Sequence, residues 1–186
     1  QTILLISLHV RPGPFKTVWI AVSAVAILTA QRDFATPRGT AQSLLRQGKV
    51  AAAIPYLNRA RAADPLHYEN SWDLALAYRQ TKRLPDARAV VKSMLVHANK
   101  GELLNLLAEI EEASGNALAA ASAYQEAAHL DSSEKHIADW ANYLMRHGAY
   151  DSAVKVYASG VGLHAKSVVL RVGLGVANYS TGDYDG

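Results

Sequence analysis

The stretch from Trp140 to Ala153 reads Trp-Ala-Asn-Tyr-Leu-Met-Arg-His-Gly-Ala-Tyr-Asp-Ser-Ala and decides the fold. It opens with a large residue followed by a small one, and the apolar residues that follow keep helical spacing. Gly148 interrupts this pattern, because a glycine just past a helix tolerates the left-handed conformation that ends it. The apolar pattern resumes after the glycine and reaches Ala153. The stretch therefore predicts two helices joined by a tight turn.

The same arrangement recurs along the chain. An alanine opens the buried face of each second helix, at spacings of 34, 33 and 33 residues: Ala53, Ala87, Ala120 and Ala153. Each first helix from the second unit onward carries a large–small pair: Leu74-Ala75, Leu107-Ala108, Trp140-Ala141 and Leu174-Gly175. The turn glycine recurs at Gly48, Gly115, Gly148 and Gly182. One helix pair cannot bury its apolar face alone, so neighbouring units are predicted to stack.

This spacing predicts a repeat domain from residue 34 to residue 186. Its units are expected at about 34–67, 68–100, 101–133 and 134–167, with a truncated fifth at 168–186. Asp64-Pro65 closes the first unit, because proline cannot continue a helix. The chain begins at Gln1 and stops inside what should become another helix, so we interpret it as a fragment or a partial gene product.

The period and these residues resemble the tetratricopeptide repeat family, in a bacterial-type protein. The resemblance covers about Phe34 to Gly186 and implies an all-α fold, an α-solenoid of helix-turn-helix repeats wound into a right-handed superhelix. It further implies a non-catalytic scaffold for protein–protein interaction, which binds a peptide or a partner protein in a concave groove. Two residues depart from the family's pattern, since Lys82 replaces a turn glycine and Gly160 replaces an alanine of the second helix.

Composition limits the chemistry of the chain. It has no cysteine, which excludes disulfides, thiolate zinc sites and cysteine nucleophiles. The charge divides unevenly, with 12 basic and 5 acidic residues in 31–100 and 5 basic and 11 acidic residues in 101–186, or +7 and −6. This split either steers partners and favours head-to-tail stacking or reflects ordinary variation among helix faces. The acidic half argues against a nucleic-acid partner.

An uncharged apolar run extends from Thr17 to Ala30 and follows Arg11 and Lys16. A basic stretch, an apolar run and small residues in this order predict a secretory signal peptide within residues 1–33, cleaved near Ala30. Leu28 is larger than the residue usually found three positions before a cleavage site. An uncleaved membrane anchor and a docking helix are therefore kept as alternative interpretations. The chain is therefore expected to be exported, periplasmic or secreted, or anchored in the inner membrane if the run is not cleaved.

No catalytic, cofactor-binding or metal site is predicted. His136 and Asp139 could share a metal ion as a minor alternative, but the histidines lack the clustered spacing of a zinc site. The glycines of Val172-Gly173-Leu174-Gly175 lie in a predicted repeat helix without a preceding strand, which argues against a nucleotide loop. The acidic run Glu109, Glu111 and Glu112 is interpreted as a solvated helix face.

The resemblance implies that exposed side chains of the first helices line the groove. By position these are Arg38, Gln42, Arg46, Glu69, Trp72, Asp73, Arg79, Asn105, Glu109, Glu112, Lys135, Asp139, Asn142 and Arg146. The selected peptide-groove residues are Arg46, Trp72, Arg79, Asn105, Glu109, Asn142 and Arg146. An asparagine side chain both donates to and accepts from a peptide backbone.

Two functional interpretations stay open. In the first, the chain is an envelope-associated adaptor that holds a peptide or a partner protein. In the second, it is the repeat or assembly portion of a larger multidomain enzyme or of a secretion-system component. A further catalytic or membrane domain in the full-length gene would favour the second.

Overall fold

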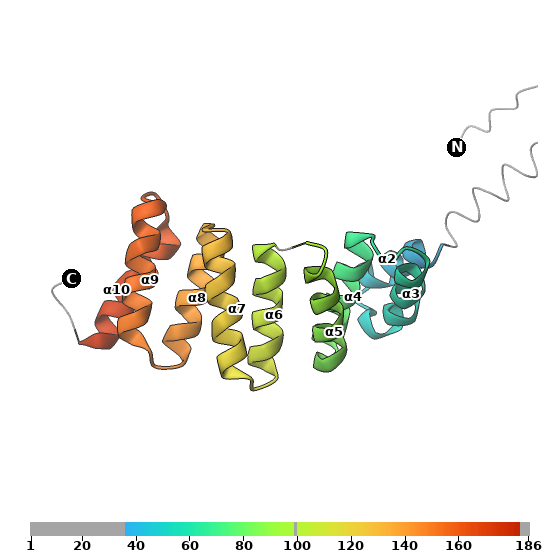
Figure 1. Ribbon diagram of the computed structural model, residues 1–186, viewed down its shortest axis with the longest axis horizontal. Helices are drawn as coiled ribbons and strands as arrows, with labels where there is room; N and C mark the ends of the chain where they lie inside the picture. The colour runs from blue at the N-terminus through green and yellow to red at the C-terminus, as the bar shows by residue number, and fades with distance from the viewer. Residues whose placement is uncertain (1–35, 99, 183–186) are drawn as a thin grey trace, which may run out of the picture. The chain divides into compact units, whose positions relative to one another are not determined.

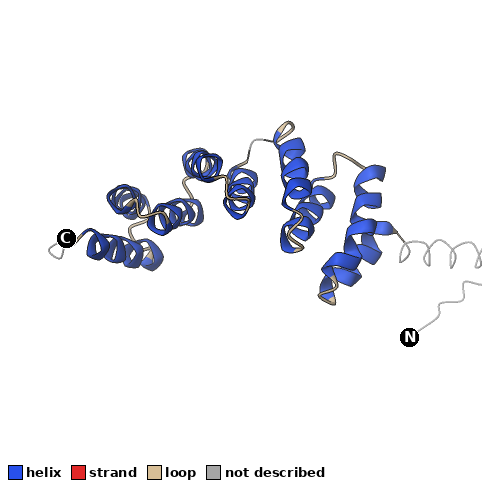
Figure 2. Ribbon diagram, turned by 90° about the horizontal axis from the view of Figure 1, so that it is seen from below, coloured by secondary structure: helices blue, strands red, loops and turns tan. Residues whose placement is uncertain are grey.

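The computed structural model describes residues 36–98 and 100–182, and these form nine α-helices and no strand (Figures 1 and 2). The helices are α2 (Pro37–Arg46), α3 (Val50–Ala63), α4 (Tyr68–Gln80), α5 (Leu84–Leu95), α6 (Gly101–Ala113), α7 (Ala117–Leu130), α8 (Glu134–Arg146), α9 (Tyr150–Leu163) and α10 (Val168–Thr181). They belong to one compact unit that begins at Pro37. Each helix packs against the next, and α8 also contacts α6 and α10. The prediction of an all-α solenoid of helix pairs is confirmed.

Tight turns close the four pairs α2–α3, α4–α5, α6–α7 and α8–α9. Gly48, Gly115 and Gly148 have φ angles of 72°, 77° and 73°, in the left-handed region predicted for them. Lys82 occupies the same place in the second pair with a φ of 62°. In every turn the next residue donates its N–H to a carbonyl in the last turn of the helix, as Arg83 does to Tyr78 at 2.8 Å. These bonds satisfy carbonyls that the helix end would otherwise leave unpaired.

The recurring alanines form the closest contacts of the core. Ala53, Ala87, Ala120 and Ala153 are all 0 % exposed, as are Ala75, Ala108 and Ala141 of the large–small pairs. Alanine has a short side chain and high helix propensity, so it lets two helices approach without weakening either. Larger residues such as Leu57 and Tyr157 fill the spaces between these contacts. Burial of one such side chain contributes about 2–3 kcal/mol.

Gly160 departs from the repeat pattern because its neighbours are large. A Cβ at this position would lie 2.6 Å from Cγ2 of Ile137 and 3.1 Å from Cδ1 of Leu170. The fourth unit therefore places Ile137 where an alanine side chain at 160 would need space. Because Gly160 has no side chain, the α9 backbone can lie close to α8 and α10.

The expected N-terminal segment, residues 1–33, lies outside the described residues. Within the described ranges, no helix is long and apolar enough to cross a bilayer. The unit boundaries stay a prediction, although the helix pairs α2–α3 to α8–α9 fall inside the first four expected ranges.

Candidate functional site

A hollow of about 750 Å³ lies along helices α4, α6 and α8. Its apolar lining consists of Trp72 and Leu76 from α4, Leu106 from α6 and Leu130 from the end of α7. The polar lining residues are Arg79, Lys100, Glu102, Asn105, Glu109, Asp131, Lys135 and His136, and Gly101 completes the lining. The hollow therefore combines an apolar patch with charged and amide groups, an arrangement suited to a peptide-like ligand.

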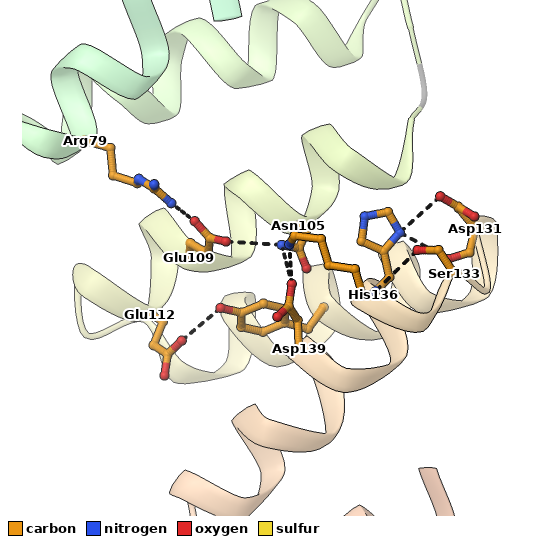
Figure 3. A network of polar contacts seen from close by, with 10 residues as sticks. Arg79, Asn105, Glu109, Glu112, Asp131, Ser133, His136 and Asp139 are labelled. Carbon is orange, nitrogen blue, oxygen red and sulfur yellow. Dashed lines mark hydrogen bonds and ion pairs between the residues drawn. The ribbon is translucent and has the colours of Figure 1, made fainter. Parts of the chain in front are cut away.

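Asn105 lies at the centre of the polar lining and is only 3 % exposed. Its Nδ2 donates to Oε1 of Glu109 at 3.2 Å and to Oδ2 of Asp139 at 2.9 Å (Figure 3). Both acceptors are carboxylates, which assigns the amide nitrogen to this side and directs Oδ1 away from them. Among the described residues, no donor reaches the buried Oδ1 of Asn105. This oxygen is a buried acceptor with unused capacity.

Ion pairs extend the Asn105 contacts to both sides. Arg79 of α4 pairs with Glu109, and Nζ of Lys135 contacts Oδ2 of Asp139 at 2.5 Å. We call this series of side-chain contacts, Arg79–Glu109–Asn105–Asp139–Lys135, the groove network. It joins α4, α6 and α8. Its charges compensate each other, and Lys135 is 66 % exposed, so each single pair contributes little to stability.

Trp72 is held in place by an aromatic neighbour. Its ring stacks on that of Tyr68 with centroids 5.9 Å apart. The hydroxyl of Tyr68 donates to Oε1 of Glu102 at 2.5 Å, which ties the start of α4 to α6. Burial, together with the hydrogen bond to Glu102, raises the pKa of Tyr68 above its ordinary range. The hydroxyl therefore stays protonated and keeps donating, so Trp72 presents a supported ring to the hollow.

His136 closes one end of the hollow and is 5 % exposed. Its Nδ1 lies 3.1 Å from the backbone oxygen of Asp131 and 3.3 Å from Oδ2 of the same residue. Gly101 makes this possible, because a Cβ there would lie 2.9 Å from both Cβ of Asp131 and Cε1 of His136. Asp139 faces Asn105 and Lys135 instead, so the two residues of the alternative metal site have different partners. No group of three or more potential ligands gathers in the described part of the chain.

The acidic run of α6 is not a solvated face, and that interpretation was wrong. Glu111 is 5 % exposed and accepts from Nε and Nη2 of Arg88 at 2.7 and 2.6 Å and from Nδ2 of Asn116 at 2.7 Å. Glu112 accepts two bonds from Arg146 at 3.0 and 2.9 Å and one from the hydroxyl of Tyr124 at 3.0 Å. The positive partners come from α5 and α8, so spacing along α6 does not reveal them.

Burial and partners shift the pKa values of these groups in different directions. Burial acts to raise the pKa of Glu111, but the hydrogen bonds from Arg88 and Asn116 and the charge of Arg88 outweigh it and hold the pKa below its ordinary value. Burial and the nearby carboxylate of Glu112 raise the pKa of Tyr124. Glu111 is therefore a charged structural group, and Tyr124 stays a neutral donor.

The structure brings some of the predicted groove residues together and separates others. Trp72, Arg79, Asn105 and Glu109 line the hollow, as does Lys135 of the wider set. Arg46 is exposed at the end of α2, and Arg146 pairs with Glu112. Asn142 is exposed and accepts from the hydroxyl of Tyr157 at 2.7 Å. The other candidates lie outside the lining: Arg38, Gln42, Glu69, Asp73, Glu112 and Asp139.

Sequence reasoning missed two lining residues within helices, Leu76 and Leu106, and six at or near helix ends and in loops: Lys100, Gly101, Glu102, Leu130, Asp131 and His136. Most of them belong to the junction where one unit ends and the next begins. Position within a repeat indicates which face of a first helix lines the groove. It does not indicate which residues the preceding second helix adds to the hollow. The glycine at the first position of α6 was a usable signal, because it indicates close approach of another chain segment.

Comparisons with known proteins agree on the fold. The family model described as Tetratricopeptide repeat matches residues 38–101 and 138–186. The structure is similar to MamA from Desulfovibrio magneticus RS-1, at a TM-score of 0.64 and 17 % identity over 78 % of this chain and 86 % of that one. It is similar to a tetratricopeptide repeat protein from Parabacteroides merdae, at 0.69 and 18 % over 83 % and 62 %.

A third similar structure is YrrB, described as a tetratricopeptide repeat protein with an unusual peptide-binding site. Its TM-score is 0.61, with 15 % identity over 88 % of this chain and 86 % of that one. No curated protein matches this sequence. At these identities the structural likeness concerns the fold.

Proposed function

The chain belongs to the tetratricopeptide repeat family, whose repeats are protein-interaction scaffolds, and from this premise we propose that it binds a segment of a partner protein in the hollow along α4, α6 and α8. The peptide-binding site described for YrrB, a protein of the same fold, supports the proposal. We further propose that the binding is non-catalytic. The polar groups of the hollow are engaged in ion pairs and amide contacts, and their arrangement does not resemble a nucleophile with its base.

The observation that carries the proposal is the pairing of an apolar patch with the unused oxygen of Asn105. Trp72, Leu76 and Leu130 offer apolar surface that a peptide side chain can cover. Oδ1 of Asn105 is buried in the free protein, and a movement of this side chain would be needed to expose it as an acceptor for a backbone N–H of the ligand. An unpaired buried acceptor costs about 1–3 kcal/mol, so its satisfaction favours the bound state.

The groove network suggests where the binding free energy comes from. Arg79, Glu109, Lys135 and Asp139 already compensate each other, so a charged ligand gains attraction only by replacing an existing partner. Contact with the apolar patch has no such competition. We therefore expect Trp72 to contribute most to affinity and the charged residues to select the ligand.

Selection from a displayed peptide library on the full chain tests the proposal. Isothermal titration of the selected peptides against wild type and Trp72→Ala is expected to show at least a tenfold loss of affinity, about 1.4 kcal/mol. Asn105→Ala is expected to weaken the same peptides. Leu118→Ala, at a 90 % exposed position of α7 outside the hollow, is the matched control. Peptides that bind Trp72→Ala as tightly as wild type would contradict this site.

We also propose that residues 1–33 direct export, on the order of basic, apolar and small residues in the sequence. N-terminal sequencing of the protein recovered outside the cytoplasm is expected to give a start close to Gln31. A start far from this residue would contradict cleavage near Ala30.

A further inference from the structure

The two ring nitrogens of His136 have different surroundings. Nδ1 lies 3.1 Å from the backbone oxygen of Asp131 and 3.3 Å from Oδ2 of the same residue (Figure 3). Both neighbours are oxygens that accept hydrogen bonds, which assigns the proton of the neutral ring to Nδ1 and the lone pair to Nε2. No described residue bonds to Nε2, and this atom is not one of the fully buried atoms without a partner. Because His136 lines the hollow, Nε2 is an acceptor that a ligand there can reach.

Asp131 differs from the other carboxylates of the hollow, because no lysine or arginine of the described chain pairs with it. Its side chain is 57 % exposed, and its ion-pair contact is to the imidazole of His136. Three ion pairs compensate the remaining charged groups in and beside the lining: Arg79–Glu109, Lys100–Glu102 and Lys135–Asp139. With a neutral imidazole, the end of the hollow at His136 therefore holds one uncompensated negative charge.

We propose that the ligand of the hollow places a lysine or arginine side chain at the His136 end, and that protonation of His136 releases it. This proposal rests on the proposed peptide binding along α4, α6 and α8. A cationic side chain there pairs with Asp131 and donates a hydrogen bond to Nε2 of the neutral ring. A protonated ring has no lone pair at Nε2 and places its own positive charge beside Asp131, so it excludes the cation. Binding is therefore expected at neutral pH and release on acidification.

The two lysines of the lining do not favour a ligand carboxylate instead, because both are engaged. Nζ of Lys100 lies 4.3 Å from the centre of the Tyr68 ring. Nζ of Lys135 lies 2.5 Å from Oδ2 of Asp139. A carboxylate must draw one of these lysines away from its present contacts and must also approach the charge of Asp131. A ligand cation meets neither obstacle.

Peptides selected from a displayed library on the full chain at about pH 7.5, where a histidine is mostly neutral, provide the probe. They are expected to contain lysine or arginine. Isothermal titration at about pH 5.5 is expected to show at least about fivefold weaker binding than at about pH 7.5, because the proton and the cation exclude each other. His136→Gln keeps a neutral polar side chain that does not titrate, so its affinity is expected to be the same at both pH values. His129→Gln, at an exposed position of α7 outside the lining, is the matched control and is expected to keep the pH dependence of wild type.

Asp131→Asn tests the carboxylate at an exposed position, where the change leaves the packing of the helices in place. It is expected to weaken the selected peptides about fivefold at neutral pH, the upper range for an exposed ion pair. This variant also decides the proposal if circular dichroism shows that His136→Gln does not fold. Unchanged affinity of Asp131→Asn would then overturn it.

Three further results would overturn the proposal: selected peptides without a basic residue, equal affinity of wild type at the two pH values, or the wild-type pH dependence in His136→Gln. In each case an affinity loss of about tenfold in Trp72→Ala would leave the peptide site itself standing. Full affinity in Trp72→Ala would instead contradict the peptide site, and with it both proposals.

Discussion

Helices α6 and α10 hold the same place in the repeat, 67 residues apart, and present opposite chemistry. Asn105, Glu109 and Glu112 of α6 correspond to Val172, Val176 and Tyr179 of α10. Each of the three α6 side chains bonds a partner on a neighbouring first helix. The equivalent α10 residues are more than half exposed.

The difference shows what a position in a repeat does and does not determine. It determines which way a side chain faces, because the helix geometry is the same in each unit. It does not determine whether that side chain is buried, because burial depends on the neighbouring units. Asn105 is 3 % exposed with α8 packed beside α6, whereas Val172 is 60 % exposed. Polar groups in the middle of the stack therefore form bonds across the contacts between units.

The largest expected effect comes from the buried acid of α6. Glu111→Ala removes the partner of Arg88 and leaves that partly buried guanidinium without its carboxylate. We expect the free energy of unfolding to fall by about 3 kcal/mol, the low end of the range for a broken buried pair, because Arg88 is 27 % exposed. Urea denaturation followed by circular dichroism measures this change.

The matched control for this prediction is Asn178→Ala, the equivalent position of α10. Asn178 is only partly buried, and we expect its loss to change the unfolding free energy by less than about 0.5 kcal/mol. A similar loss for both variants would mean that α10 is as enclosed as α6. That outcome would weaken the comparison between the two helices.

Two glycines of α10 allow a packed and an open position of the same helix to be compared. Gly173→Ala would place a Cβ 2.3 Å from Cε1 of Tyr157, so the ring must move, and we expect a loss of about 1–3 kcal/mol. Gly175→Ala meets open space and should stabilise the helix by about 0.5–1 kcal/mol through higher propensity. Thermal unfolding at low protein concentration compares them. Destabilisation by Gly175→Ala would indicate that another segment covers this face.

The sequence predicted the backbone more completely than the contacts between units. The turn glycines and the buried alanines are local requirements of a helix pair, so their spacing was enough to identify them. Lys82 was noted as a departure from the turn pattern, and its φ of 62° shows that the turn keeps its shape despite the residue. Lys82 is the only residue other than glycine with a positive φ in the described part of the chain.

The candidate site was predicted only in part, for a physical reason. Trp72 and Asn105 lie on the groove face of a first helix, where position alone indicates them. Leu130 and His136 reach the hollow from a junction between units, whose geometry depends on how the units pack. The arginine partners of Glu111 and Glu112 lie 23 and 34 residues away along the chain, so the acidic run alone was interpreted as exposed to solvent.

A smaller effect is expected where the turns of two units differ. Lys82→Gly should stabilise the protein by about 1 kcal/mol, because glycine adopts the left-handed conformation without a Cβ conflict. Gly115→Lys, the reverse change in the third unit, should destabilise it by a similar amount. Differential scanning calorimetry records both melting temperatures. A lower melting temperature for Lys82→Gly would show that the lysine side chain contributes a contact larger than the strain.

The smallest expected effect tests whether the charge of Glu111, apart from the size of its side chain, stabilises the protein. Because the Arg88 and Asn116 bonds hold the pKa of Glu111 below its ordinary value of 4.5, the folded state binds this proton less readily than the unfolded state. The resulting stabilisation is complete above the pKa of Glu111 in the unfolded state and is lost as the pH falls through the lower pKa in the folded state.

Glu111→Gln keeps the size of the side chain and removes its titration. The difference in unfolding free energy between wild type and Glu111→Gln should therefore be constant near neutral pH and shrink on acidification below about pH 4.5. Glu126→Gln, at an exposed position of α7, removes a carboxylate with no ion pair to another described residue and serves as the control. A constant difference between wild type and Glu111→Gln down to the acid transition would mean that hydrogen bonding to Arg88, and not the charge of Glu111, joins α5 to α6.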